Sequence, residues 1–301
     1  MSKLLFLLLL ALTSPAAAQT VHSLDQVPAV LKTPEAKAAF AQQIQGQAAP
    51  DGLGARLPAV LSAAQITGLL VPGSDRTPAS VVGARPAPGQ PGVYVAIACT
   101  GGNRPGPSDD KTCDQSQFGV PRPDMHVYVG LIQATAGSPP RLLARPAVLD
   151  GKVDWRDTLL GDASDAVEDA KDGLLVPDDI TRFDLAPYVI APGQRAFGLL
   201  GTWNVGYAGG GAQFAALYLF AVVDGAVTQI LATPMSFSKN IAGDWHKDGT
   251  RDHDITEGAN ILVVTRHATN GHFDLLQKAR TEKASRLFQW SATANRYEPA
   301  D

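Results

Sequence analysis

Short apolar runs separated by turn residues dominate the last two-thirds of the chain. Many of their residues are β-branched or aromatic, and glycine, proline, asparagine or aspartate lies between them, a spacing that predicts short antiparallel strands. We therefore expect a mainly β fold, built as an antiparallel sandwich or an open barrel or meander, with a small N-terminal helical segment. The expected strands cover residues 93–98, 125–134, 141–148, 195–203, 213–223, 226–232, 260–266, 272–280, 285–291 and 296–297.

One of the expected hairpins carries a specific turn signal. Asp224-Gly225 separates two apolar runs. Asp-Gly favours the tight two-residue turns that join antiparallel strands, because both residues tolerate a positive φ. The strands on either side of Asp224-Gly225 are therefore expected to pair, and residues 260–266 are expected to pair with 272–280 across the four-residue linker 268–271.

The region before residue 93 has a different texture. Thr33 is placed to cap a helix, Pro34 suits its first position, and Gly46 is a plausible end. Residues 71–92 are crowded with proline and glycine, which predicts a surface loop. We expect an N-terminal segment, 19–92, that is helical and rich in proline and glycine, followed by a β-rich domain, 93–301, with an acidic insertion at 150–179.

The first residues have the pattern of an export signal. A basic start at Lys3 precedes an apolar run, 4–12, and the segment ends in Ala16-Ala17-Ala18. This order is typical of a secretory signal peptide, so 1–18 is interpreted as one, with cleavage near Ala18. The mature protein is then expected in the periplasm or outside the cell. No later stretch is apolar for 18 residues, so no membrane insertion is expected after cleavage.

Charge excludes one class of partner. The chain has 25 basic and 29 acidic side chains, giving a net charge of −4. Proteins that bind nucleic acid need a basic patch to neutralise phosphates, and no such stripe is present. An unidentified protein or glycan is the expected partner.

The two cysteines, Cys99 and Cys113, are close in sequence. In an exported protein they are expected to form a disulfide. The alternative, a thiol nucleophile, has no local signature to support it.

One short stretch suggests specific chemistry, with acids at alternating positions and a glycine at the sixth. It reads D-x-H-x-D-G-x-x-D from residue 244 to residue 252. Alternating side chains bring oxygen ligands to one side, glycine permits a sharp turn, and the seventh residue offers its carbonyl, as a calcium loop requires. The candidate metal ligands are Asp244, His246, Asp248, Thr250 and Asp252.

This stretch resembles the calcium loops of EF-hand, dockerin and FG-GAP modules over nine residues, and the resemblance implies calcium as a cofactor. It departs from them at His246, where an oxygen ligand is expected, and at Ile255, where an EF-hand has glutamate. Imidazole suits zinc, copper or nickel better than calcium. Two alternatives stay open: a polar turn that binds nothing, and a zinc site built from some of His246, His253, His267 and His272.

No complete catalytic constellation is present. The chain has no nucleophile elbow, and the S-x-x-K match at 236–239 lacks the companion motifs of penicillin-recognising enzymes. No glycine-rich nucleotide loop opens a helix, so no bound organic cofactor is expected. The catalytic residues, if any, stay unknown.

The leading hypothesis is an exported, non-catalytic binding or structural protein of the cell envelope, stabilised by calcium. One alternative is an envelope-polymer hydrolase, metal-assisted or using two carboxylates, with a pocket shared by His246, His253 and His272. Another is a periplasmic enzyme inhibitor that presents loop 206–211 or loop 100–112.

Overall fold

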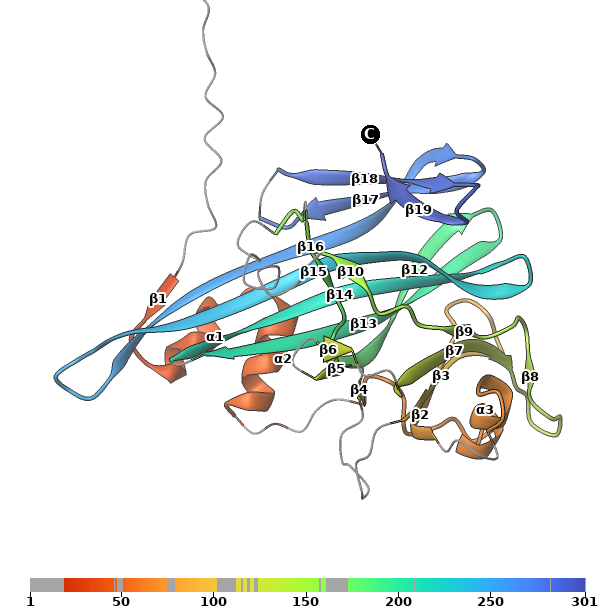
Figure 1. Ribbon diagram of the computed structural model, residues 1–301, viewed down its shortest axis with the longest axis horizontal. Helices are drawn as coiled ribbons and strands as arrows, with labels where there is room; N and C mark the ends of the chain where they lie inside the picture. The colour runs from red at the N-terminus through yellow and green to blue at the C-terminus, as the bar shows by residue number, and fades with distance from the viewer. Residues whose placement is uncertain are drawn as a thin grey trace, which may run out of the picture.

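The computed structural model describes residues 19–300, apart from 46, 48–50, 75–78, 102–111, 115, 118–119, 122–123, 157, 161–172, 208 and 282. The predicted signal peptide, 1–18, and most of loop 100–112 therefore lie outside the described residues. The chain is mainly β with a few short helices, as the hydrophobic pattern predicts (Figure 1). Within the described part, no helix has the length and apolarity needed to cross a membrane.

The main sheet is an antiparallel meander whose strand order follows the chain from β12 to β19. Two short strands from elsewhere complete it: β4 (Cys113–Asp114) pairs with β12, and β1 (Gln19–Val21) pairs with β16. The meander consists of β12 (Asp179–Ala191), β13 (Gln194–Tyr207), β14 (Gly210–Val223), β15 (Ala226–Trp245), β16 (Arg251–Thr269), β17 (His272–Ala279), β18 (Ser285–Ser291) and β19 (Arg296–Pro299).

The two-residue turn at Asp224-Gly225 is confirmed, and the second hairpin pairs as expected but across two residues instead of the linker 268–271. Asp224 and Gly225 have φ values of 50° and 74° and join β14 to β15. Asn270 and Gly271 have φ values of 51° and 84° and join β16 to β17. Two successive residues in the left-handed region match the twist of the flanking strands, which explains why these dipeptides fix the pairing.

A smaller antiparallel sheet contains β2 (Ala79–Pro86), β3 (Val93–Thr100), β7 (His126–Gln133) and β8 (Arg141–Leu142), and β9 (Ala147–Val148) also pairs with β7. The loop predicted for 71–92 was therefore wrong in part, because it contains β2. This strand lies at the edge of the sheet, where proline is tolerated. Two two-stranded ribbons are separate: β5 (Ser116–Gln117) with β6 (Val120–Pro121), and β10 (Val153–Asp154) with β11 (Leu174–Leu175).

The acidic insertion at 150–179 begins with a buried anchor. β10 and β11 lie within it, and the buried Trp155 packs edge-on against Trp203 of the main sheet, with ring centroids 4.8 Å apart. Residues 161–172 of the insertion are outside the described residues. The start of the insertion is thus part of the core, although its acidic composition is typical of a solvent-exposed segment.

The two sheets pack face to face. Val95, Ile97 and Val129 of the smaller sheet share one buried cluster with Phe197 and Phe220 of the main sheet. The opposite face of the main sheet packs against its own last strands, which curl over it; Leu217 and Leu219 meet residues of β17–β19 there. The architecture is therefore an antiparallel sandwich whose larger sheet folds back on itself.

Short helices cover the remaining apolar faces. α3 (Ala63–Leu70) buries Ile66 and Leu70 against the outer face of the smaller sheet. The 3-10 turn η1 (Leu24–Gln26) leads to α1 (Val27–Val30) and α2 (Pro34–Gln43), which pack on β16 around Ile255. The predicted cap is confirmed, because the Thr33 hydroxyl accepts a hydrogen bond from the Ala36 amide at 3.0 Å.

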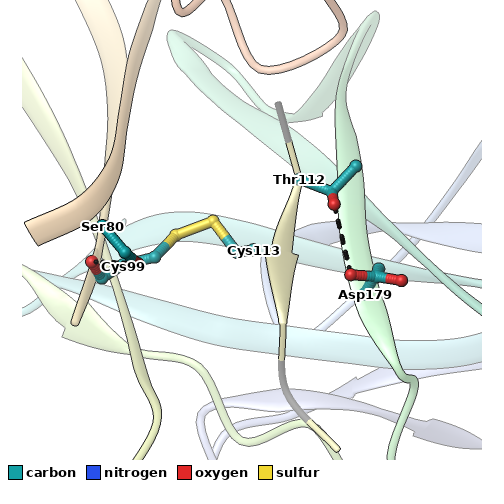
Figure 2. Close-up of a disulfide and its surroundings, with 5 residues drawn as sticks. All are labelled: Ser80, Cys99, Thr112, Cys113 and Asp179. Carbon is teal, nitrogen blue, oxygen red and sulfur yellow. Dashed lines mark hydrogen bonds between the residues drawn. A yellow bond between two sulfur atoms is a disulfide. The ribbon is translucent and has the colours of Figure 1, made fainter. Parts of the chain in front are cut away.

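A buried disulfide between Cys99 and Cys113 connects the two sheets (Figure 2). Cys99 lies in β3 of the smaller sheet and Cys113 in β4 at the edge of the main sheet. Next to it, the Thr112 hydroxyl donates to Asp179 at 3.2 Å, which holds β4 against β12. The predicted pairing is confirmed, and a structural disulfide of this kind is typical of proteins outside the cytosol.

Candidate functional site

The nine-residue stretch 244–252 forms the tip of the long hairpin made by β15 and β16, which projects at one end of the molecule (Figure 1). Inside the turn, the His246 amide donates to the Thr250 carbonyl at 2.8 Å, and the Gly249 amide donates to the His246 carbonyl at 3.1 Å. Gly249 has a φ of 83°, so glycine is needed for this turn. The sequence pattern thus folds as a tight hairpin turn.

Asp248 and Thr250 are brought together within the turn. The Asp248 carboxylate accepts from the Thr250 amide at 3.0 Å and from its hydroxyl at 2.7 Å. These two hydrogen bonds lower the pKa of Asp248. The Thr250 carbonyl, which a calcium loop would use, accepts the hydrogen bond from His246 described above.

Asp252 lies between two histidines. His246 Nε2 is 2.6 Å from Asp252 Oδ1, and His22 Nδ1 is 2.8 Å from the same oxygen. Hydrogen bonding with Asp252 raises the pKa of His246, and the two histidines lower the pKa of Asp252. These two hydrogen bonds therefore hold the Asp252 carboxylate between two imidazoles. The same set of groups also suits a transition-metal cation.

Of the five predicted metal ligands, the structure pairs His246 with Asp252 and Asp248 with Thr250. Asp244 is near enough to His246 to contribute to its raised pKa. The five residues therefore lie in one small turn, and calcium binding there stays a prediction.

His22 is the residue that the sequence did not point to. It follows β1, whose register places Val21 opposite His253 and Thr20 opposite Asp254. Continuing that register puts His22 opposite Asp252. The only sequence signal was the short β-type run 19–21, which has no turn or periodicity to identify its partner strand.

The other histidines have separate environments. His253 Nδ1 is 3.1 Å from Asn240 Oδ1, whereas His272 stacks on Trp290 with ring centroids 3.9 Å apart. His272 pairs with Thr269, 16 residues beyond His253 along β16, which corresponds to about 50 Å of extended strand. The pocket that His246, His253 and His272 were expected to share is therefore not seen in the described part of the chain. Among the described residues, one group has ligand atoms close enough together to hold a metal ion: His22, His246 and Asp252.

A groove of about 450 Å³ lies beside the hairpin, between the N-terminal helices and the main sheet. Apolar side chains of the helical segment form one wall: Leu24, Val27, Leu31, Ala36, Phe40 and Ile44. The strands contribute the polar residues Asn204, Gln213, Ser238, Asn240 and His253, together with the apolar Val205, Ala212 and Ile255. Glycines 206, 210 and 211 also line the groove. Because glycine has no side chain, these positions leave the groove open.

The groove and the histidine cluster lie on opposite faces of the hairpin. His253, in the groove lining, and Asp252, in the cluster, are successive strand residues, whose side chains point to opposite sides. The segment that follows His22 carries Leu24 and Val27 of the groove wall. One N-terminal segment therefore contributes to both features.

Comparisons with known proteins add no relative. No protein-family model, no curated protein and no solved structure matches the chain.

Proposed function

We propose that the protein is an exported, non-catalytic binding protein whose groove between α1–α2 and the main sheet takes an amphipathic small molecule with a fatty-acyl-like apolar body. The observation that carries this proposal is the lining of the groove, which combines an apolar wall with uncharged amide and hydroxyl groups. Its volume of about 450 Å³ is within the range of small-molecule sites, roughly 300–1,000 Å³.

The polarity of the lining defines the ligand. The Gln213 amide donates to Asn204 at 3.2 Å, and His253 contacts Asn240, so the polar side is organised in pairs. Such a surface suits a neutral head with hydrogen-bonding groups, whereas the wall of leucine, valine and phenylalanine suits a hydrocarbon chain. No nucleophile with an adjacent base lines the groove among the described residues, which supports binding over turnover.

Export is the second part of the proposal. The buried Cys99–Cys113 disulfide supports an oxidising compartment, and the predicted signal peptide, 1–18, agrees with it. Stabilisation by calcium at the hairpin is kept as an expectation of the sequence pattern.

The groove is tested by filling it. Gly206 has open space where a Cβ would lie, and its φ is not in the left-handed region, so Gly206→Phe should fold and fill the groove. The probe is a fluorescently labelled monoacylglycerol, whose head group is neutral, displaced by unlabelled monolaurin. We expect binding to wild type and at least a tenfold loss of affinity in Gly206→Phe. Gly68→Phe is the matched control, because Gly68 in α3 also has open space and is far from the groove lining.

A second pair of variants tests the apolar wall. Ile44 in the wall is 53% exposed and Val148 in β9 is 52% exposed, so aspartate at either position leaves the core intact. The Ile44→Asp variant should bind the neutral monoacylglycerol more weakly, and the Val148→Asp variant should bind it as tightly as wild type does. Equal affinity in all four variants and wild type would refute the proposed ligand site.

A further inference from the structure

The cluster of His22, His246 and Asp252 joins three parts of the chain: the residue after β1, the hairpin turn and the start of β16. We propose that it is a zinc site. His22 Nδ1, His246 Nε2 and a carboxylate oxygen of Asp252 are the protein ligands, and water completes the tetrahedron. This inference does not depend on what the groove binds.

The spacing of the donor atoms fits such an ion after a small adjustment. Their ligand atoms all lie within 4.8 Å of one another. Ligands at about 2.0–2.1 Å from zinc in a tetrahedron are separated by about 3.3 Å. The two histidine nitrogens are now 2.8 and 2.6 Å from Asp252 Oδ1, so each moves outward by roughly half an ångström. That movement is easy for His22, whose side chain is 66% exposed.

Binding exchanges hydrogen bonds for coordinate bonds. Each imidazole nitrogen that faces Asp252 gives up its hydrogen bond to the carboxylate and offers its lone pair to the ion, and any proton on it passes to water. Where that nitrogen carries a proton, its N–H bond is the one covalent bond that breaks, and no oxidation occurs. Asp244 and Asp248 also lie close enough to His246 to interact with it electrostatically, so the surroundings of the site are acidic.

The donor set favours zinc over calcium. Calcium prefers six to eight oxygen ligands, whereas two imidazoles with one carboxylate and a water suit zinc. The Thr250 carbonyl and the Asp248 carboxylate, which a calcium loop would use, already take part in hydrogen bonds of the turn. The sequence pattern and the structure therefore indicate different ions at the same hairpin.

The proposed ion would fasten the N-terminal segment to the hairpin. β1 is three residues long, and His22 directly precedes the segment that carries Leu24 and Val27. Coordination of zinc by His22 would add one strong contact to the three-residue pairing of β1 with β16. Zinc is thus expected to hold one wall of the groove in place.

The test is a titration of tag-free, metal-stripped full-length protein with Zn²⁺, followed by calorimetry, with Ca²⁺ titrated in parallel. We expect one zinc per chain. His22→Ala and His246→Ala should each weaken zinc binding by more than the roughly 10- to 100-fold typical for loss of an outer-shell partner. His126→Ala is the matched control, because His126 is exposed at the start of β7 and belongs to no such cluster among the described residues.

A second readout separates the proposed site from adventitious binding. Zinc should slow hydrogen exchange at the amides of residues 20–22 in wild type but not in His246→Ala, although position 246 is far from them in sequence. Unchanged zinc affinity in His22→Ala would overturn the proposal. So would binding of Ca²⁺ that zinc does not displace, since that result would assign the hairpin to a calcium loop.

Discussion

At the scale of single residues, Asp274 has an unusual environment. Its side chain is 1% exposed, and Oδ2 lies 2.6 Å from Nδ1 of His267, which is 74% exposed. Its other oxygen, Oδ1, is buried and has no hydrogen-bond partner among the described residues. The stability of this buried carboxylate therefore depends strongly on one surface histidine.

His267→Ala should lower the free energy of unfolding by about 2–3 kcal/mol, because it leaves a buried acid without its partner. His126→Ala, the same substitution at an exposed position, should change it by less than about 0.5 kcal/mol. Chemical denaturation measures both. Equal stability of the two variants would show that His267 does not support Asp274.

Glu257 provides a pH-dependent test at the same scale. It is half-buried, its Oε1 accepts from the Lys32 amide at 2.5 Å, and its Oε2 is buried without a hydrogen-bond partner in the described chain. Burial raises the pKa of Glu257 above its ordinary value. The folded state therefore favours the neutral acid, and stability falls as pH rises from 4.5 through the raised pKa.

Glu257→Gln keeps the acceptor for Lys32 and removes the charge. The variant should melt a few degrees higher than wild type at pH 7, with the effect limited because solvent screens a half-exposed carboxylate. Below pH 4 the two proteins should melt at the same temperature. A difference that does not change with pH would contradict this explanation.

At the scale of elements, the disulfide cross-links the two sheets. Its cysteines, in β3 and β4, are 14 residues apart in sequence, and both are fully buried. A loop of this size contributes about 3 kcal/mol in the chain-entropy model. At about 2–4 °C per kcal/mol for a protein of this size, replacing both cysteines with alanine should lower Tm by about 6–12 °C.

Reductant provides the control for that variant. Because the sulfur atoms are buried, dithiothreitol should reduce the native protein slowly at room temperature and should act during heating. Wild type heated with reductant should then melt close to the double-alanine variant. A variant that melts with wild type would mean that the sheets are held by packing alone.

Local signals predicted most strands, and two failures have physical causes. β12 was not predicted because Asp184 and Pro187 interrupt its pattern, and the strand accommodates them with register shifts against β13. β15 continues past residue 232 through Pro234, which lies next to another register shift, between Ala215 and Ala216 of β14. Irregular pairing permits residues that a regular strand excludes.

At the scale of the whole molecule, sequence reasoning singled out the stretch 244–252 but missed His22, which lies beside it. His246 and Asp252 are six residues apart and share a turn. His22 and Asp252 are 230 residues apart, and only the pairing of β1 with β16 brings them together. No periodicity or turn chemistry encodes a contact at that separation, so a single sequence cannot supply it. The same reason explains why the groove, with walls from both ends of the chain, was not predicted.

The pairing of β1 with β16 also has a kinetic consequence. From β12 to β19, each strand meets its neighbour across one turn, so these contacts close short loops and form early. Thr20 must instead find Asp254 across 234 residues, which costs much more chain entropy. We therefore expect β1 to dock during folding onto an edge of β16 that already exists, so that the N-terminal wall of the groove forms after the meander.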